Sequence, residues 1–424
     1  AGLVGPEEAL TRRQEEQRLS VQNASPEGKD DGVCHRPDPL TGLLRQGDFR
    51  AHMARVCSEC ERFSLALLNV DMARRDGESS GAIQPMTQPE HIMAQVADLA
   101  RSVCGRKVPG GRFGLNSLIF FHPDLEAEPL RELYEKLCAD IASRLGVRAG
   151  VGLACWPFLD LRPSDMIEGA REALEYSLLL PAPHIGQFGS LALNISADKR
   201  HCRGDVFGAI EEYKLALLAD EDNVLAWNSL GVCLASLGRH AEARRFFEEA
   251  IQRTPDDPAL AYNLGAVCQS LHDNEAAAEH FRTCIRLSPS HLYALIRLGQ
   301  LDEAEERLEE ARARFESAAA LDTGSPLPYR HLARLALRLG KADQAREHLH
   351  QALLRNPRDV AALSLMAALY LDGGEDPELA ESLARQSVAL RPEYRNGWLV
   401  LSRALEVQGR LSDAREALLK AGEL

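Results

Sequence analysis

VLAWNSLGVCLASLGRHAEARRFFEEAIQRTPDD, residues 224–257, is the stretch that decides how most of this chain is interpreted. Its apolar residues recur at helical spacing in two short runs, which a glycine separates and a proline closes. The small residues Gly231 and Ala243 stand where two helices must approach closely. The bulky residues Trp227 and Phe247 fill the space between the helices. The stretch therefore predicts a helical hairpin.

Similar spacing returns through the C-terminal half of the chain with a period of about 34 residues. This periodicity predicts an all-α solenoid over residues 189–424, with six to seven repeats. The third unit has no glycine between its helices, so we expect a distorted or shifted turn there. The fifth unit carries one extra residue near Gly373 and Gly374. The first helix of the earliest unit, residues 190–202, is weakly patterned, and the preceding domain's last strand running into a helix is the alternative.

In residues 224–257 the pattern Trp227, Leu230-Gly231, Phe247 and Pro255 resembles the tetratricopeptide repeat (TPR), with Leu234 in place of the usual Tyr. In that family the first helix of each repeat lines a concave groove that holds a peptide. The resemblance places the following side chains in the groove: Asn228, Tyr262, Asn263, Arg297, Arg330, Arg334 and Arg403.

The groove arginines leave three interpretations open. Guanidinium forks suit carboxylates and phosphorylated side chains, which favours an acidic peptide segment as the partner. Asn263 and Arg297 also match two positions of the clamp with which some family members hold a peptide C-terminus, but Val232 and Tyr293 leave that clamp incomplete. In the third interpretation the arginines pair with neighbouring acidic residues on solvated faces.

Before the repeats, residues 36–188 alternate between strand-like and helical patterns. The predicted strands are residues 63–72, 116–123 and 147–157, and the predicted helices are residues 90–104, 129–145 and 164–180. A further helix follows the turn at residues 38–43. This alternation predicts an α+β sandwich in which helices cover a sheet.

Four short motifs occur in a fixed order in this region: DPLTGL at 38–43, RFGLNSL at 112–118, GVGLA at 150–154 and AREAL at 170–174. In that order they resemble the GGDEF family, the bacterial diguanylate cyclases. The resemblance implies a nucleotide-cyclase-like (GGDEF-type) fold over residues 36–188.

The family's chemistry does not carry over to these residues. Its cyclases hold divalent cations with acidic residues from the first strand and from the hairpin. The acidic positions are replaced by Asn69, Asn116 and Ser117, the second glycine by Leu115, and the phosphate-binding lysine by Leu178. The inhibitory-site positions fall on Gly105 and Val108, and Asp71 alone keeps its carboxylate. The resemblance therefore implies a pseudo-enzyme.

Composition restricts the class of protein further. The chain has 424 residues, 45% of them hydrophobic, and a formal net charge of −14, which argues against non-specific nucleic-acid binding. No apolar run is long enough for a membrane span. The 10 cysteines lie scattered, which favours reduced thiols, and the lone Cys57-x-x-Cys60 has no further ligands at zinc spacing.

Residues 1–35 predict a charged helix over 7–19 followed by a flexible linker. There is no initiator Met, so an upstream domain in a longer parent protein stays open. The whole chain is interpreted as a bacterial, cytoplasmic, non-catalytic scaffold without metal or cofactor that binds a protein or peptide, with dimerisation through the GGDEF-like domain as a further hypothesis. The alternatives are a sensor in which the GGDEF-like domain binds a guanine nucleotide without turnover, and a residual cyclase.

Overall fold

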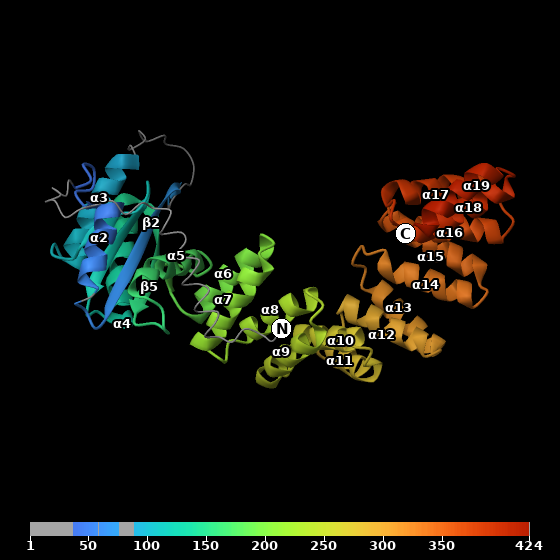
Figure 1. The fold of residues 1–424 in the computed structure, drawn as a ribbon, viewed down its shortest axis with the longest axis horizontal. Helices are drawn as coiled ribbons and strands as arrows, with labels where there is room; N and C mark the ends of the chain where they lie inside the picture. The colour runs from blue at the N-terminus through green and yellow to red at the C-terminus, as the bar shows by residue number, and fades with distance from the viewer. Residues whose placement is uncertain (1–36, 58, 76–88, 424) are drawn as a thin grey trace. The chain divides into compact units, whose positions relative to one another are not determined.

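The computed structural model describes residues 37–57, 59–75 and 89–423 (Figure 1). The helix and linker expected in residues 1–35 lie outside these residues. The chain divides into two compact units, one ending at Arg253 and the other beginning at Thr254.

The first unit contains a six-stranded sheet in the order β1-β3-β4-β2-β5-β6. The strands are β1 Leu44–Arg45, β2 Phe63–Arg75, β3 Gly110–Arg112, β4 Ser117–Pro123, β5 Val147–Trp156 and β6 Ile185–Gln187. β2 lies at the centre and pairs antiparallel with both β4 and β5, while β3 and β4 form an antiparallel hairpin. The hairpin thereby places residues 113–116 at one end of the central strand.

Helices cover both faces of this sheet. They are α2 Gln46–Val56, α3 Pro89–Cys104, α4 Ala127–Leu145 and α5 Met166–Ser177, with a short 3-10 turn, η1 Pro163–Asp165, before α5. The order β2-α3-β3-β4-α4-β5 is a split β-α-β arrangement. The predicted α+β region is thus confirmed, whereas its resemblance to GGDEF domains stays a prediction.

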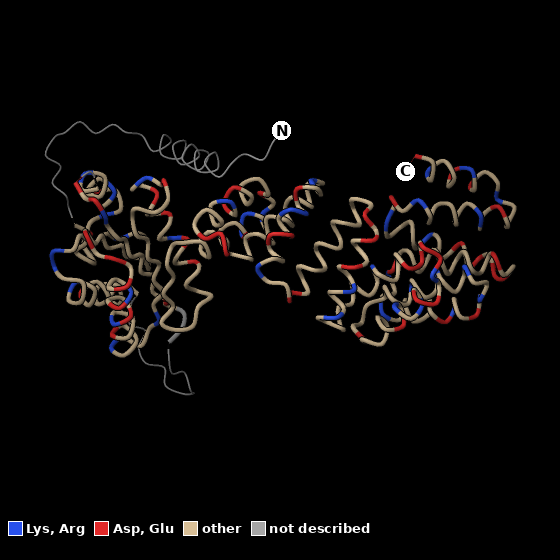
Figure 2. Tube along the Cα trace, turned by 90° about the horizontal axis from the view of Figure 1, so that it is seen from below, with Lys and Arg blue, Asp and Glu red and all other residues tan. Residues whose placement is uncertain are grey.

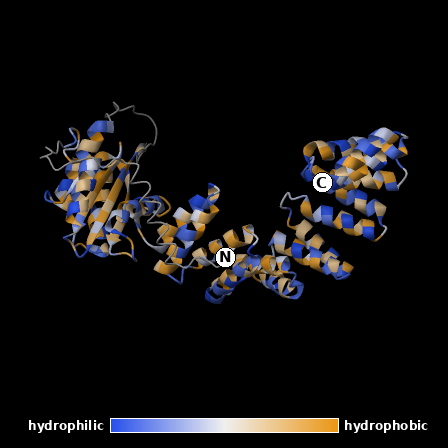
Figure 3. Ribbon diagram, viewed as in Figure 1, coloured by the Kyte–Doolittle hydropathy of each residue, from blue (hydrophilic) through white to orange (hydrophobic). Residues whose placement is uncertain are grey.

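Alternate residues of β2 face opposite layers, as the period of a strand requires. Ala66 and Leu68 belong to the core beneath α3 and α4, and Leu65 and Leu67 to the core beneath α2 and α5. Figure 3 shows β2 and β5 as largely hydrophobic. On β5, a Cβ at Gly152 would lie 2.0 Å from a carbonyl oxygen of α5, so the helix rests directly on the strand.

The helical hairpins begin inside the first unit. They are formed by α6 Ser190–Cys202, α7 Val206–Ala219, α8 Val224–Ser236 and α9 His240–Arg253. The weakly patterned segment 190–202 is therefore a helix, and β6 precedes it. Side chains of α6, α7 and α8 lie in the same core as β2 and α5, so no flexible linker separates the sheet from the first hairpins. The expected domain boundary at residue 188 stays a prediction.

The second unit consists of helices alone. They are α10 Pro258–Ser270, α11 Asn274–Leu287, α12 Leu292–Ala304, α13 Leu308–Ala320, α14 Leu327–Arg338, α15 Ala342–Arg355, α16 Val360–Asp372, α17 Pro377–Leu390, α18 Arg395–Val407 and α19 Leu411–Gly422. Consecutive helices pair as hairpins around small alanine-rich cores. The period of the sequence predicted this unit.

The expectation of a distorted turn in the third repeat is wrong. Within each hairpin from α8 to α19, the residue after the first helix's C-cap has a positive φ, 60° at Glu306 and 69° at Gly340. A hydrogen bond of the same kind closes both turns, from Arg307 N to Asp302 O at 2.8 Å and from Lys341 N to Ala336 O at 2.9 Å. Glu306 thus adopts the left-handed conformation that glycine supplies in most of the other hairpins. The extra residue of the fifth repeat is Asp376, which caps α17.

A prediction concerns His272, which holds the same turn position in the second repeat with φ 63°. An L side chain costs about 1 kcal/mol or more there, so His272→Gly should raise the free energy of unfolding by up to about 1 kcal/mol. Gly340→Ala is the matched control, because a Cβ at Gly340 meets nothing within 4 Å. It should destabilise by about 1 kcal/mol in urea unfolding. If both substitutions changed the free energy of unfolding in the same direction, this explanation would be contradicted.

Candidate functional site

Three of the cyclase-equivalent positions lie together where β2 runs beside β4. Asn69 and Ser117 are direct partners in the strand register, and Asn69 Nδ2 donates a hydrogen bond to Ser117 Oγ at 2.9 Å. Next to them, the backbone N–H of Val70 donates to the carbonyl oxygen of Asn116 at 2.9 Å. Two neutral side chains thus satisfy each other where the family resemblance would place cation-binding carboxylates.

The other three positions do not add a charged site. Leu115 is 82% exposed at the hairpin tip, and Leu178, which follows α5, is 68% exposed. Asp71 lies opposite Arg148 in the register of β2 and β5. Across the described residues, no group of three or more His, Cys, Asp or Glu side chains could hold a metal ion.

The predicted groove residues all lie on the first helices of their hairpins. Asn228 is on α8 in the first unit. In the second unit, Tyr262 and Asn263 are on α10, Arg297 on α12, Arg330 and Arg334 on α14, and Arg403 on α18. We call the exposed sides of the first helices the first-helix face, which is formed by α6 and α8 in the first unit and separately by α10, α12, α14, α16 and α18 in the second unit. Figure 2 shows basic and acidic residues interspersed along the helices rather than segregated.

Most of the predicted arginines pair with a carboxylate of a neighbouring first helix or of its cap. Arg330 Nη1 donates to both oxygens of Asp359, at 3.2 and 3.1 Å, and Asp359 is only 6% exposed. Arg403 Nη2 donates to Asp372 at 2.6 Å. Some N–H donors of each guanidinium are thus used for contacts between repeats.

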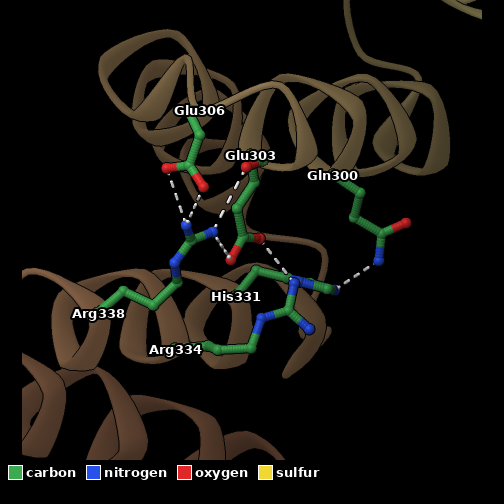
Figure 4. A network of polar contacts seen from close by, with 6 residues as sticks. All are labelled: Gln300, Glu303, Glu306, His331, Arg334 and Arg338. Carbon is green, nitrogen blue, oxygen red and sulfur yellow. Dashed lines mark hydrogen bonds and ion pairs between the residues drawn. The ribbon is translucent and has the colours of Figure 1, made fainter. Parts of the chain in front are cut away.

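Arg334 belongs to a larger network between α12 and α14 (Figure 4). Its Nη2 donates to Glu303 at 2.7 Å, and Arg338 donates to Glu303 at 3.3 Å and to Glu306 at 2.9 and 3.0 Å. Burial acts to raise the pKa of Glu303, but the two guanidinium groups outweigh it and hold that pKa below its usual value. Glu303 therefore remains an anion that joins two arginines.

His331 forms the inner wall of this network. It is 5% exposed, and its ring stacks on Phe315 with centroids 5.0 Å apart. Arg334 Nη2 lies 3.2 Å from Nδ1 and the Gln300 amide nitrogen lies 3.3 Å from Nε2. Both neighbours are donors, and a neutral imidazole accepts at one ring nitrogen only, so each tautomer accepts from one of them. Burial, reinforced by Arg334 and Arg330, lowers the pKa of His331 to about 4. The imidazole is therefore neutral at pH 7.

Arg297 differs from the other arginines. It is exposed, and its hydrogen bond runs from Nη1 to a neutral group, the side-chain oxygen of Gln269, at 3.3 Å. Tyr293, one helical turn earlier on α12, is 55% exposed. Tyr262, by contrast, is only partly exposed and packs on His291 with ring centroids 4.8 Å apart. Arg297 and Tyr293 thus offer a charged and an aromatic group side by side.

Sequence reasoning missed the acidic members of these pairs, Glu303, Asp359 and Asp372. A signal for two of them exists in the repeat period. Residues one period apart lie on neighbouring first helices, so a partner one helical turn away is separated by about 31 residues. Arg334 and Glu303 are 31 residues apart, and so are Arg403 and Asp372.

Three family models described as tetratricopeptide repeat match the chain. One covers residues 222–290, another 303–369, and a third both 263–326 and 365–423. Residues 222–423 are tetratricopeptide repeats. The predicted TPR solenoid is therefore confirmed for helices α8 to α19, and among the described residues no helix is long and apolar enough to cross a membrane.

Curated proteins of different kinds are similar in sequence to parts of this chain. Human "Protein O-mannosyl-transferase TMTC3" is 25% identical over 230 residues, which are 49% of this chain and 25% of that protein. "TPR repeat-containing protein YpiA" of Bacillus subtilis (strain 168) is 26% identical over 141 residues, 33% of each chain. The chain thus spans a quarter to a third of these two relatives. A solved tetratricopeptide repeat protein from Parabacteroides merdae is 19% identical with a TM-score of 0.47, covering 55% of this chain and 92% of that one.

The depressed pKa of His331 makes a prediction about acid stability. An unfolded histidine takes up a proton near pH 6.5, whereas folded His331 takes it up near pH 4, so the unfolded state binds more protons between these values. Folding stability is therefore lost as the pH falls through this window. Between pH 7 and pH 5 the loss should be roughly 2 kcal/mol, at 1.36 kcal/mol per pKa unit. Glu303, with its lowered pKa, adds a further loss at lower pH.

His331→Gln should reduce this difference between pH 7 and pH 5, while His350→Gln, at an exposed position of α15, should leave it unchanged. Urea unfolding followed by Trp398 fluorescence measures it, with Trp156 and Trp227 replaced by Phe so that the signal reports the second unit. An equal loss of stability on acidification in the His331→Gln variant would contradict the role of this side chain.

Proposed function

We propose that this chain is a non-catalytic scaffold that binds a segment of a partner protein on the first-helix face of its repeats. The observation that carries the proposal is the match of residues 222–423 to tetratricopeptide repeats, combined with arginines on that face that keep unused donors. A guanidinium has five N–H donors. Only Nη2 of Arg334 is hydrogen-bonded to described residues, and this side chain is 46% exposed.

An acidic segment is the partner that fits these donors. Arg297 has a neutral partner and lies beside the exposed ring of Tyr293, so a carboxylate can reach its guanidinium without displacing another anion. Arg334 and Arg338 are already held by Glu303, which fixes their orientation and reduces the entropy lost on binding. These contacts support acidic side chains on the partner, and the same groups would also accept a peptide C-terminus.

Selection of 12-residue peptides from a random display library, with the full chain as bait, tests this proposal. Enriched peptides should carry Asp or Glu, and Arg297→Gln should weaken their binding about tenfold or more, since a charge-assisted hydrogen bond contributes about 1.5–3 kcal/mol. Arg312→Gln is the matched control, because Arg312 is an exposed arginine on a second helix, α13, paired with Glu316. Unchanged binding of the acidic peptides by Arg297→Gln, or an equal loss in Arg312→Gln, would overturn the proposal.

Neutral substitutions are preferable to charge reversal at this face. Arg330→Glu would place a second carboxylate beside Asp359, which is 6% exposed. Breaking a buried pair by removing one partner costs several kcal/mol, so lost binding could then reflect lost folding. Arg297 avoids this difficulty because its partner is neutral.

We further propose that residues 36–188 are a degenerate GGDEF-like domain without turnover. The split β-α-β arrangement and the hairpin residues 113–116 beside the end of β2 support this assignment. The bond between Asn69 and Ser117, and the exposed side chains of Leu115 and Leu178, oppose the binding of a metal-bound nucleotide. The nine described cysteines are free thiols, which supports a reducing, cytoplasmic setting.

Incubation of the chain with GTP and Mg²⁺ should therefore give no cyclic dinucleotide by chromatography. Restoring two carboxylates through Asn116→Asp and Ser117→Glu should not restore turnover, because Leu115 still occupies the place of the second glycine and Asn69 that of the first-strand carboxylate. Product from the unmodified chain that disappears in Asp71→Ala would identify a residual cyclase instead.

A further inference from the structure

Asp198 is an exposed carboxylate on α6 that two buried side chains hold in place. The hydroxyl of Tyr213 donates to Oδ1 at 2.5 Å, and Nδ2 of Asn194 donates to Oδ2 at 3.3 Å. Tyr213 is 2% exposed and Asn194 4% exposed, so packing fixes both donors. A carboxylate oriented in this way is a prepared acceptor for a ligand.

The two donors do not use all the acceptor sites of the Asp198 carboxylate, and they do not neutralise its charge. A carboxylate has about four lone-pair sites, and both donors are neutral. Within the part of the chain that the structure describes, no cationic side chain forms an ion pair with Asp198. The neighbouring cations are engaged elsewhere, Lys199 with Glu175 at 2.6 Å and Arg200 with Asp205 at 3.0 Å. The open acceptor positions therefore suit an incoming cation.

The surface beside this carboxylate is aliphatic. On the first helices of the first two hairpins, Leu191 is 44% exposed, Leu225 59% and Val232 38%. Ser229 of α8 interacts with the same Tyr213 hydroxyl that donates to Asp198, which places this side of α8 near the carboxylate. At the start of both helices, Asn223 Nδ2 donates to Ser190 Oγ at 2.7 Å. The two helices are thus fixed side by side.

We propose that this part of the first-helix face, the Asp198 subsite, binds a lysine or arginine side chain of a partner polypeptide. The cationic head donates to Asp198, and the methylene stem lies on Leu225 and Val232, an arrangement that matches the two chemical parts of such a side chain. The inference rests on the proposed function in one respect, that first helices bind a polypeptide. It adds a subsite of opposite charge in the first unit.

Charge complementarity decides between the occupants of this surface. An acidic segment would meet the carboxylate of Asp198, which has only neutral hydrogen-bond partners among the described residues. A purely apolar segment would cover that carboxylate without replacing its solvent, which is costly. A basic residue with aliphatic neighbours satisfies both the carboxylate and Leu225.

An array of 12-residue peptides tests the proposal with the full chain. One central position carries Lys, Arg, Gln, norleucine or Glu, and Leu, Val, Ala and Ser fill the flanks. The unmodified chain should be retained at least tenfold more on Lys- or Arg-centred peptides than on Gln- or norleucine-centred ones, and Asp198→Asn should lose that preference. Equal retention on all peptides, or a preference that survives in Asp198→Asn, would overturn the Asp198 subsite.

Two further variants keep the test decisive if Asp198→Asn alters the fold. Leu225→Gln changes an exposed side chain and should weaken all Lys-centred peptides about fivefold, with unchanged circular dichroism. Tyr213→Phe keeps the charge of Asp198 but removes one of its two hydrogen-bond donors, and it should reduce the Lys preference only partly. If Leu225→Gln and Tyr213→Phe both retained the Lys-centred peptides as well as the unmodified chain does, the subsite would be contradicted. Arg297→Gln should keep the Lys preference while losing retention on Glu-centred peptides, so failure here and failure of the proposed function are told apart.

Discussion

One face of the central sheet is apolar and must be covered by helices. The way in which helices cover it determines the arrangement of the rest of the first unit. Leu65, Phe121 and Ala154 present a continuous apolar surface on that face. Helix α5 rests on β5 at Gly152, where any side chain would meet the helix backbone. Residues of α6, α7 and α8 complete the same core, so the first helical hairpins are built onto the sheet. Solenoids need their terminal repeats shielded from water, and the sheet supplies that shielding here whether or not the domain retains any nucleotide chemistry.

In the second unit each small core also contains residues from the first helix of a neighbouring hairpin, and charged pairs join the first helices as well. Small residues allow the close packing within each hairpin: a Cβ at Gly299 would lie 2.6 Å from the ring of Phe315. Between hairpins, Arg334 and Arg338 converge on Glu303, and Arg330 reaches Asp359. The same arginines that offer donors to a partner thus also connect the repeats, which is why sequence position alone does not separate binding from stabilising roles.

The helical period and the alternation of the strands predicted most of the fold, because both depend on which side of an element is buried. The turn at Glu306 could not be predicted in this way, since a glutamate in the left-handed conformation is held by the hydrogen bond of Arg307 to Asp302 and not by local preference. For the candidate site, the resemblance placed the arginines on first helices, but their partners depend on side-chain contacts across repeats. The third interpretation, pairing with neighbouring acids, describes Arg330, Arg334 and Arg403; Arg297 is the exception.

The charged groups of the first-helix face therefore differ in how much free energy is lost from their existing contacts when a partner binds. Arg330 is matched to an almost buried carboxylate, so an acidic partner would have to compete with Asp359 for its donors. Among the described residues, Arg297 and Asp198 have neutral hydrogen-bond partners, so an incoming opposite charge would not displace a charged side chain of those residues. Because specificity is a difference between affinities, the groups without a counter-charge discriminate most strongly between partners. In the proposed function, the paired arginines hold the first helices of the second unit together, Arg297 selects for an anionic group there, and Asp198 selects for a cationic group in the first unit.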